Sequence, residues 1–86
     1  MKFYTYILKN NKGKVYIGQT NNLKRRIEEH NEIGFGYTSK HRPWILIYKE
    51  EFCTRKDAMN RERFLKSGIG RDWIKNNLLS TPSSVG

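Results

Sequence analysis

Five polar side chains in three separate segments have the types needed to hydrolyse a phosphodiester: Tyr6, Tyr16, Arg26, His30 and Glu62. Such a reaction needs a base that takes a proton from water, positive charge on the phosphorane oxygens and a group that stabilises the leaving oxygen. A phenol, whose pKa is ordinarily about 10, is a poor base at neutral pH. Tyr6 would therefore need cations nearby to acquire phenolate character, and the excess positive charge of the chain favours this.

Glu62 supplies a carboxylate that could hold a hard cation. Mg²⁺ keeps several of its waters and needs few protein carboxylates when a substrate phosphate completes its coordination shell. A single carboxylate among the five candidates therefore predicts one ion, Mg²⁺ or Mn²⁺, rather than two.

A helix is predicted over residues 22–31, with the capping types Thr20 and Asn21 ahead of it. Helical spacing divides its side chains into two groups. The inward stripe holds Leu23, Arg26, Ile27 and His30, and the outer side holds Lys24, Arg25, Glu28 and Glu29. Two of the five candidates thus share the stripe that should face the core.

A second helix, "RKDAMNRERFLKS", follows a capping Thr54 and ends at the glycine pair Gly68 and Gly70. Its apolar face would hold Ala58, Met59, Glu62 and Leu65. A buried charge without a partner is costly, so the inward Arg, His and Glu should be paired, bound to metal or at the edge of a wet cleft. The simpler alternative is a structural ion pair between Arg26 and Glu62, with His30 half-buried beside it.

The tyrosines lie on a predicted β-hairpin, with strands over residues 3–9 and 14–19 and the turn "NNKGK" between them. Tyr6 and Tyr16 point to the same side of the sheet only if the numbers of two residues paired across the hairpin add up to an even number. A bulge or an odd-length loop at Gly13 produces such a register. Gly18 would leave a gap beside Tyr16 that a ligand backbone could enter.

A third strand, "WILIYKEEF", is predicted over residues 44–52, with Trp44, Leu46, Tyr48 and Phe52 on one face. An ordered loop over residues 32–43 precedes it, and a short third helix follows at residues 71–79. The order ββαβαα predicts one small α/β (α+β) domain over residues 1–79, with a three-stranded, mainly antiparallel sheet flanked by helices. Residues 80–86 should form a frayed tail.

The chain has 86 residues and a net charge of +9, which suggests a polyanionic partner, nucleic acid before a membrane surface. Basic residues that could contact phosphates are Lys24, Arg25, Lys40, Arg42 and Lys66. No apolar run long enough to span a membrane and no secretory signal is visible, so we expect a cytoplasmic protein. The single cysteine, Cys53, excludes an internal disulfide.

Three separated segments together resemble the GIY-YIG endonuclease superfamily, in its small stand-alone bacterial branch related to the nuclease module of excision repair. Tyr4-Thr5-Tyr6 keeps only the tyrosine of the first half-motif, whereas Tyr16-Ile17-Gly18 matches the second. Arg26 and His30 in "LKRRIEEHN" and Glu62 in "AMNRERFLKSGIGR" match the family's later positions. Gln19 stands where some members carry lysine, and Lys40 or Lys66 could replace that charge.

The resemblance implies metal-dependent cleavage of DNA, with Glu62 as the metal ligand. Which tyrosine is the base stays open; we assign that role to Tyr6 and give Tyr16 the positioning of water or phosphate. So small a chain has little room for sequence-specific readout, which favours structure-selective or weakly specific cutting, or delivery by a protein partner, in processes such as repair or recombination.

Two other functions stay open. One is a catalytically idle nucleic-acid-binding module that keeps the basic surface. The other is a metal-independent ribonuclease that uses His30 and His41 as acid and base, with Lys40 at the phosphate.

Overall fold

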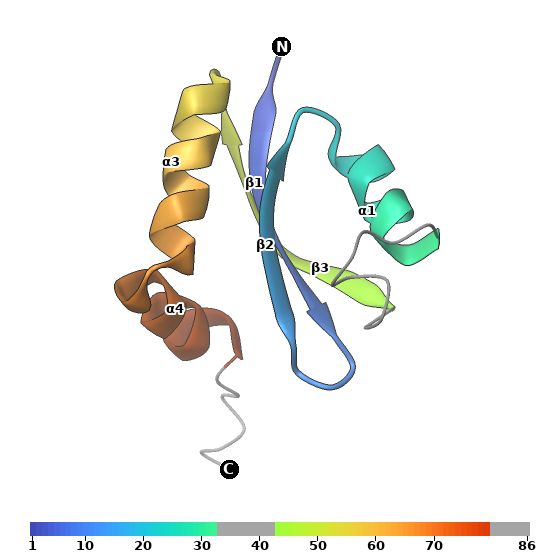
Figure 1. The fold of residues 1–86 in the computed structure, drawn as a ribbon, viewed down its shortest axis with the longest axis vertical. Helices are drawn as coiled ribbons and strands as arrows, with labels where there is room; N and C mark the ends of the chain where they lie inside the picture. The colour runs from blue at the N-terminus through green and yellow to red at the C-terminus, as the bar shows by residue number, and fades with distance from the viewer. Residues whose placement is uncertain (33–42, 80–86) are drawn as a thin grey trace.

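The computed structural model describes residues 1–32 and 43–79 of the chain. Three strands form one antiparallel sheet in the order β2-β1-β3, with α1 on one face and α3 and α4 on the other (Figure 1). The elements are β1 (Phe3–Asn10), β2 (Val15–Thr20), α1 (Leu23–Glu32), β3 (Trp44–Phe52), α3 (Arg55–Lys66), α4 (Gly68–Ile74) and a π-helical turn, η1 (Lys75–Leu79). The predicted α+β fold and its ββαβαα order are confirmed.

The β1–β2 hairpin has the register that puts both tyrosines on one side of the sheet. Tyr6 pairs with Gly18 and Leu8 pairs with Tyr16, so the paired numbers have an even sum. Gly13 takes a positive φ of 84° in the turn, a conformation that glycine adopts without strain. The Asn10 side chain accepts hydrogen bonds from the backbone of Lys12 and Lys14 and closes the turn.

The predicted alternation along β3 is wrong at its centre, because the strand carries a β-bulge. Ile7 of β1 pairs with Tyr48 and the next residue, Leu8, pairs with Leu46, which leaves Ile47 as the extra residue. An extra residue moves every side chain beyond it to the opposite face. Leu46 accordingly packs on the α1 face, whereas Tyr48 packs on the α3 face, edge-on to Trp73 with ring centroids 5.3 Å apart.

Both faces of the sheet bury apolar side chains, so β1 lies in the middle of the molecule. On the α3 and α4 face the core cluster is Ile7, Ile17, Leu65 and Ile74. On the α1 face it is Tyr6, Leu8 and Trp44, with Tyr16 and Leu23 packed against it. The Thr5 hydroxyl donates a buried 2.7 Å hydrogen bond to the Ala58 carbonyl and fixes α3 against the sheet.

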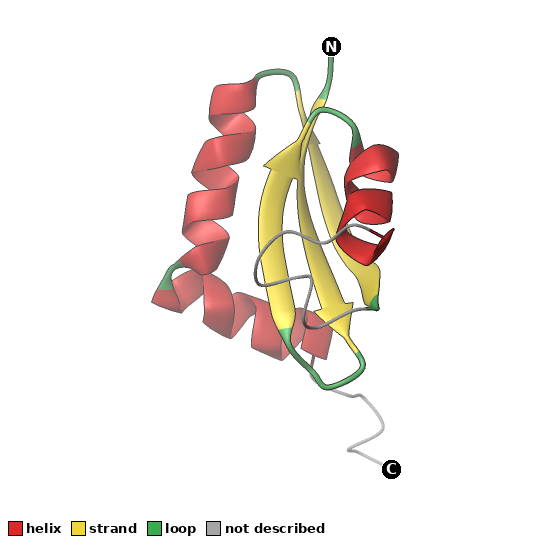
Figure 2. Ribbon diagram, turned by 45° about the vertical axis from the view of Figure 1, so that its right-hand side comes forward, coloured by secondary structure: helices red, strands yellow, loops and turns green. Residues whose placement is uncertain are grey.

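The helix ends differ from prediction in two places. Asn22 caps α1, because its side chain accepts from the Arg25 backbone N–H and its carbonyl from that of Arg26. Thr54 caps α3 as expected. The glycine pair, however, lies at the start of α4 and does not separate two helices. A Cβ on Gly70 would collide with the Phe64 carbonyl oxygen. Only glycine therefore lets α4 turn so closely across the end of α3 (Figure 2).

On α3, Met59 is exposed and does not join Ala58 and Leu65 in the core. None of the helices described over residues 1–32 and 43–79 is long and apolar enough to cross a membrane. The predicted loop after α1 falls largely on residues 33–42, and the predicted tail on residues 80–86; both ranges lie outside the described residues.

Candidate active site

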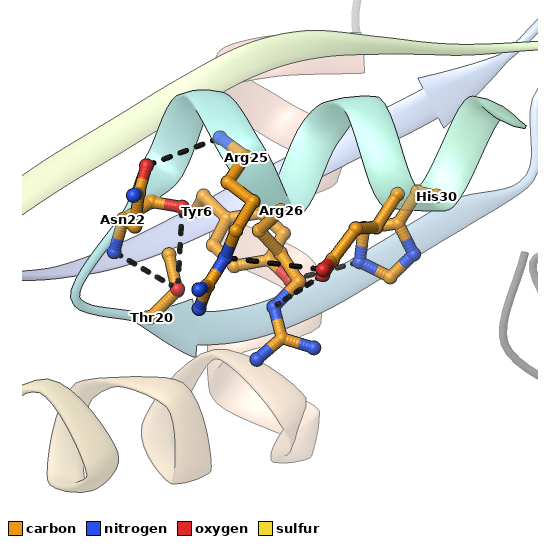
Figure 3. A network of polar contacts seen from close by, with 7 residues as sticks. Tyr6, Thr20, Asn22, Arg25, Arg26 and His30 are labelled. Carbon is orange, nitrogen blue, oxygen red and sulfur yellow. Dashed lines mark hydrogen bonds and ion pairs between the residues drawn. The ribbon is translucent and has the colours of Figure 1, made fainter. Parts of the chain in front are cut away.

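Three rings from three elements meet on the α1 face of the sheet: Tyr6 of β1, Tyr16 of β2 and His30 of α1. Their centroids lie 6.3 Å apart for the two tyrosines, 6.0 Å for Tyr6 and His30, and 4.8 Å for Tyr16 and His30. The Tyr6 hydroxyl lies 2.9 Å from Nε2 of His30, within hydrogen-bond distance (Figure 3). Asn31 secures the C-terminal end of α1, because its side chain bonds both backbone groups of Trp44 on β3.

Gly18 provides the room for the Tyr6 phenol. A Cβ at this position would lie 2.7 Å from the Tyr6 hydroxyl oxygen and 3.1 Å from Cε2 of Tyr16. The predicted gap for a ligand backbone is thus filled by the protein's own side chain, since Tyr6 stands directly opposite Gly18 in the register. Gly18 acts on the site by allowing Tyr6 to reach His30.

Gly18→Ala is therefore expected to displace the Tyr6 hydroxyl from His30 and to lower the free energy of unfolding by about 1–3 kcal/mol, the usual cost of overpacking. Chemical denaturation measures the stability, and the chemical shifts of the His30 ring report the displacement of the hydroxyl. Gly68→Ala is the matched control, because a Cβ there meets nothing within 4 Å. Equal stability of the two variants would contradict the steric role of Gly18.

Burial changes the proton affinity of both partners. The pKa of Tyr6 lies well above the usual phenol range because the ring is buried; Tyr16, Glu62 and Glu29 add to the increase and Arg26 opposes it. The expectation that the basic chain would favour a phenolate is therefore wrong for Tyr6, since desolvation outweighs the attraction of the cations. Burial and the charge of Arg26 lower the pKa of His30, so its imidazole is neutral at pH 7.

Arg26 lies one helical turn before His30, partly exposed, with its guanidinium pointing away from the axis of α1 (Figure 3). Its Nε lies 4.0 Å from a carboxylate oxygen of Glu29. The alternative, a structural ion pair between Arg26 and Glu62, is absent from the described residues. Glu62 forms its ion pair with Lys66 instead.

Glu62 projects from α3 with its side chain only 22% exposed. One carboxylate oxygen lies 2.7 Å from Nζ of Lys66, one turn further along the helix. Met59, Arg63 and Lys66 line a cavity of about 270 Å³ with it. Its partner Lys66 also lines a cavity with Tyr16, so α3 reaches the neighbourhood of the rings at the β2 edge.

The donor set suits a hard, weakly chelated cation. In the described part of the chain, no three His, Cys, Asp or Glu side chains gather as a metal cage. A single carboxylate at an open cavity is instead what Mg²⁺ or Mn²⁺ uses when water and a substrate phosphate supply its remaining ligands. Glu62 therefore fits the predicted one-ion site.

A second cavity, of about 240 Å³, adjoins Tyr16 at the free edge of β2 and is lined by Val15, Tyr16, Ile17, Lys66 and Arg71. Arg71 donates from Nε to the Lys66 carbonyl at 3.2 Å. Arg71 is not among the five phosphate-contacting candidates named from the sequence. The close turn between α3 and α4 at Gly70 brings Arg71 to Lys66. No local sequence pattern predicts this turn.

Two of the remaining basic candidates, Lys24 and Arg25, are not part of this group. Lys24 lines a separate cavity with Tyr4 and Lys49, and Arg25 lies on the outer side of α1, 3.8 Å from Glu29. Gln19 accepts a hydrogen bond from Arg55 at the start of α3. Two further candidates, Lys40 and Arg42, lie outside the described residues, as does His41.

Comparison with known proteins gives one family and one fold. Residues 2–75 match the family model of the GIY-YIG catalytic domain. A UPF0213 protein of Staphylococcus haemolyticus is 40% identical over 67 residues, covering 77% of this chain and 82% of that protein. One from Clostridium perfringens is 42% identical over 64 residues, covering 73% and 69%.

Among solved structures, the solution NMR structure of the UPF0213 protein from Bacillus halodurans is similar to this fold. It has a TM-score of 0.54 and 30% sequence identity, and the match covers 88% of this chain and 84% of that one. The resemblance indicated by the sequence is confirmed, and so is the fold class.

Proposed function

This chain belongs to the GIY-YIG nuclease family, and from that premise we propose that it is a divalent-metal-dependent endonuclease that hydrolyses DNA phosphodiesters. The observation that carries the proposal is the cluster of Tyr6, Tyr16 and His30 with its Tyr6–His30 hydrogen bond. Glu62 is linked to this cluster through its ion-pair partner Lys66, which lines one cavity together with Tyr16.

In the proposed mechanism Tyr6 and His30 work as one proton acceptor. A free phenolate is unfavourable at the buried Tyr6, but the phenol can take a proton from water while its own proton passes to Nε2 of the neutral His30. The hydroxide so formed attacks phosphorus, the bond to the leaving oxygen breaks, and that oxygen takes a proton from solvent. The hydrogen bond thus removes the need for a stable phenolate.

The other groups bind and orient the substrate. Tyr16 is partly exposed at the β2 cavity and would position water or a phosphate oxygen. Arg26 would place its guanidinium on a phosphorane oxygen. Glu62 would hold one Mg²⁺ or Mn²⁺ ion, which when bound supplies positive charge for the phosphorane and the leaving oxygen.

The proposal includes weak sequence specificity. The basic side chains near the site, Lys66 and Arg71, suit phosphate contacts, which position nucleic acid without reading its sequence. Structure-selective cutting, or delivery to DNA by a protein partner, fits a role in repair or recombination.

Incubation of the purified protein with supercoiled, branched and single-stranded DNA tests the proposal. We expect nicking or cutting in Mg²⁺ or Mn²⁺ that EDTA abolishes. Salt-sensitive binding of DNA without scission under any divalent metal would contradict it and would favour an idle binding module. Cleavage that survives EDTA and requires a 2′-hydroxyl would favour the ribonuclease alternative.

A further inference from the structure

Lys66 lines both cavities beside the candidate site. One cavity contains Glu62, whose carboxylate Lys66 contacts at 2.7 Å, and the other contains Tyr16 and Arg71. A lysine carries its ammonium on a flexible four-carbon stem with three donor hydrogens, so one side chain can serve either cavity. In the structure described, the ammonium is on the Glu62 side.

The two cavities suit groups of opposite charge. Glu62 is mostly buried, so its carboxylate requires a cation, and Lys66 supplies one from the next helical turn. The cavity at Tyr16 is lined by donors from Tyr16, Lys66 and Arg71 and by two apolar side chains, with no carboxylate among the five lining residues. Such a cavity suits an anion with several acceptor oxygens.

We propose that Lys66 exchanges Glu62 for a phosphate group of the substrate when a divalent cation binds Glu62. The inference rests on the proposed function. A dication at this carboxylate would repel an ammonium group within hydrogen-bond distance of the same oxygens. The released ammonium would join Arg71, whose Nε is already fixed on the Lys66 carbonyl, at a phosphate beside Tyr16. Lys66 thereby couples metal binding to DNA binding.

Lys66→Met tests the competition for Glu62 without DNA. We expect the Mn²⁺ affinity, measured from the EPR signal of the free ion, to rise by about 3- to 10-fold, because a competing ion pair and a nearby positive charge are both removed. Arg63→Met is the matched control: Arg63 lines the Glu62 cavity, yet within residues 1–32 and 43–79 it has no ion pair. An unchanged Mn²⁺ affinity in Lys66→Met, or an equal rise in Arg63→Met, would overturn the exchange.

DNA affinity tests the second half of the exchange. With a short fluorescent duplex, Lys66→Met should weaken binding in Ca²⁺ but hardly in EDTA, where Lys66 is held by Glu62. The salt slope in Ca²⁺ should fall by about 0.9, because the variant neutralises one phosphate fewer than the wild type. An equal weakening with and without the metal would show that Lys66 binds phosphate permanently and would overturn the proposal.

Glu62→Gln tests the release of Lys66 without a metal. It frees Lys66 permanently, so the variant should bind DNA in EDTA more tightly than the wild type, and adding Lys66→Met should remove the gain. If the wild type cleaves DNA and these variants show no such pattern, the exchange is wrong and the proposed function stands. If the wild type binds Mn²⁺ and shows this pattern but does not cleave DNA, the nuclease proposal fails and the exchange stands. A wild type that does not bind Mn²⁺ would overturn both.

Discussion

Glu62→Gln is expected to lower the rate of DNA cleavage by about 10³-fold in Mg²⁺ or Mn²⁺, because it removes the one carboxylate proposed to hold the ion. The amide keeps the size of the side chain. The substitution also breaks the ion pair with Lys66, whose side chain is half exposed. Exposed pairs of this kind contribute at most about 1 kcal/mol to stability. Cleavage rates at saturating metal, set beside thermal melts, separate loss of chemistry from loss of fold.

The matched control is Glu28→Gln, which removes the same charge from the exposed side of α1. It should cleave DNA within about twofold of the wild-type rate, because an exposed charge is screened by salt beyond about 10 Å. Similar rates for the wild type, Glu28→Gln and Glu62→Gln would refute the role of Glu62. Higher metal concentration should not restore Glu62→Gln, since a neutral amide is a poor ligand for a hard cation.

The elements that carry the site can be predicted because their signals are local. The strand types around Tyr6 and Tyr16, the Gly13 turn and the helical spacing of Arg26 and His30 each depend on residues close in sequence. Gly13 also allows the register that places both rings on one side, as the pairing of Tyr6 with Gly18 confirms. Local chemistry is thus enough to bring the two tyrosines together.

The features that differ from prediction depend on contacts between distant segments. The bulge at Ile47 reflects how β3 must fit against β1 while side chains fill both faces, and no turn residue marks it. The raised pKa of Tyr6 follows from the α1 layer over the sheet, which a count of charges does not include. Gly70 has the residue type of a helix stop, and only the three-dimensional turn shows that the Phe64 carbonyl excludes a side chain there.

Tyr6→Phe and His30→Gln are each expected to lower cleavage by about 10²- to 10⁴-fold, the range for loss of a positioned proton acceptor. Each removes one member of a pair that works as a unit, so the double variant should be no slower than the slower single variant. Glutamine can still accept the Tyr6 hydrogen bond but cannot take up its proton, so His30→Gln separates proton transfer from positioning. Tyr4→Phe, two residues earlier on the same strand, is the control and should keep the wild-type rate within about twofold.

The pH dependence of cleavage provides a second test of the pair. His30 accepts a proton only when neutral, so activity should fall as the pH drops through its pKa. Because burial and Arg26 lower that pKa, the fall should occur below the ordinary histidine value of about 6.5. In His30→Gln the remaining activity should lack this acid limb. Multiplicative losses in the double variant, together with an unchanged acid limb in His30→Gln, would mean that Tyr6 and His30 act separately and that the proton leaves water by another route.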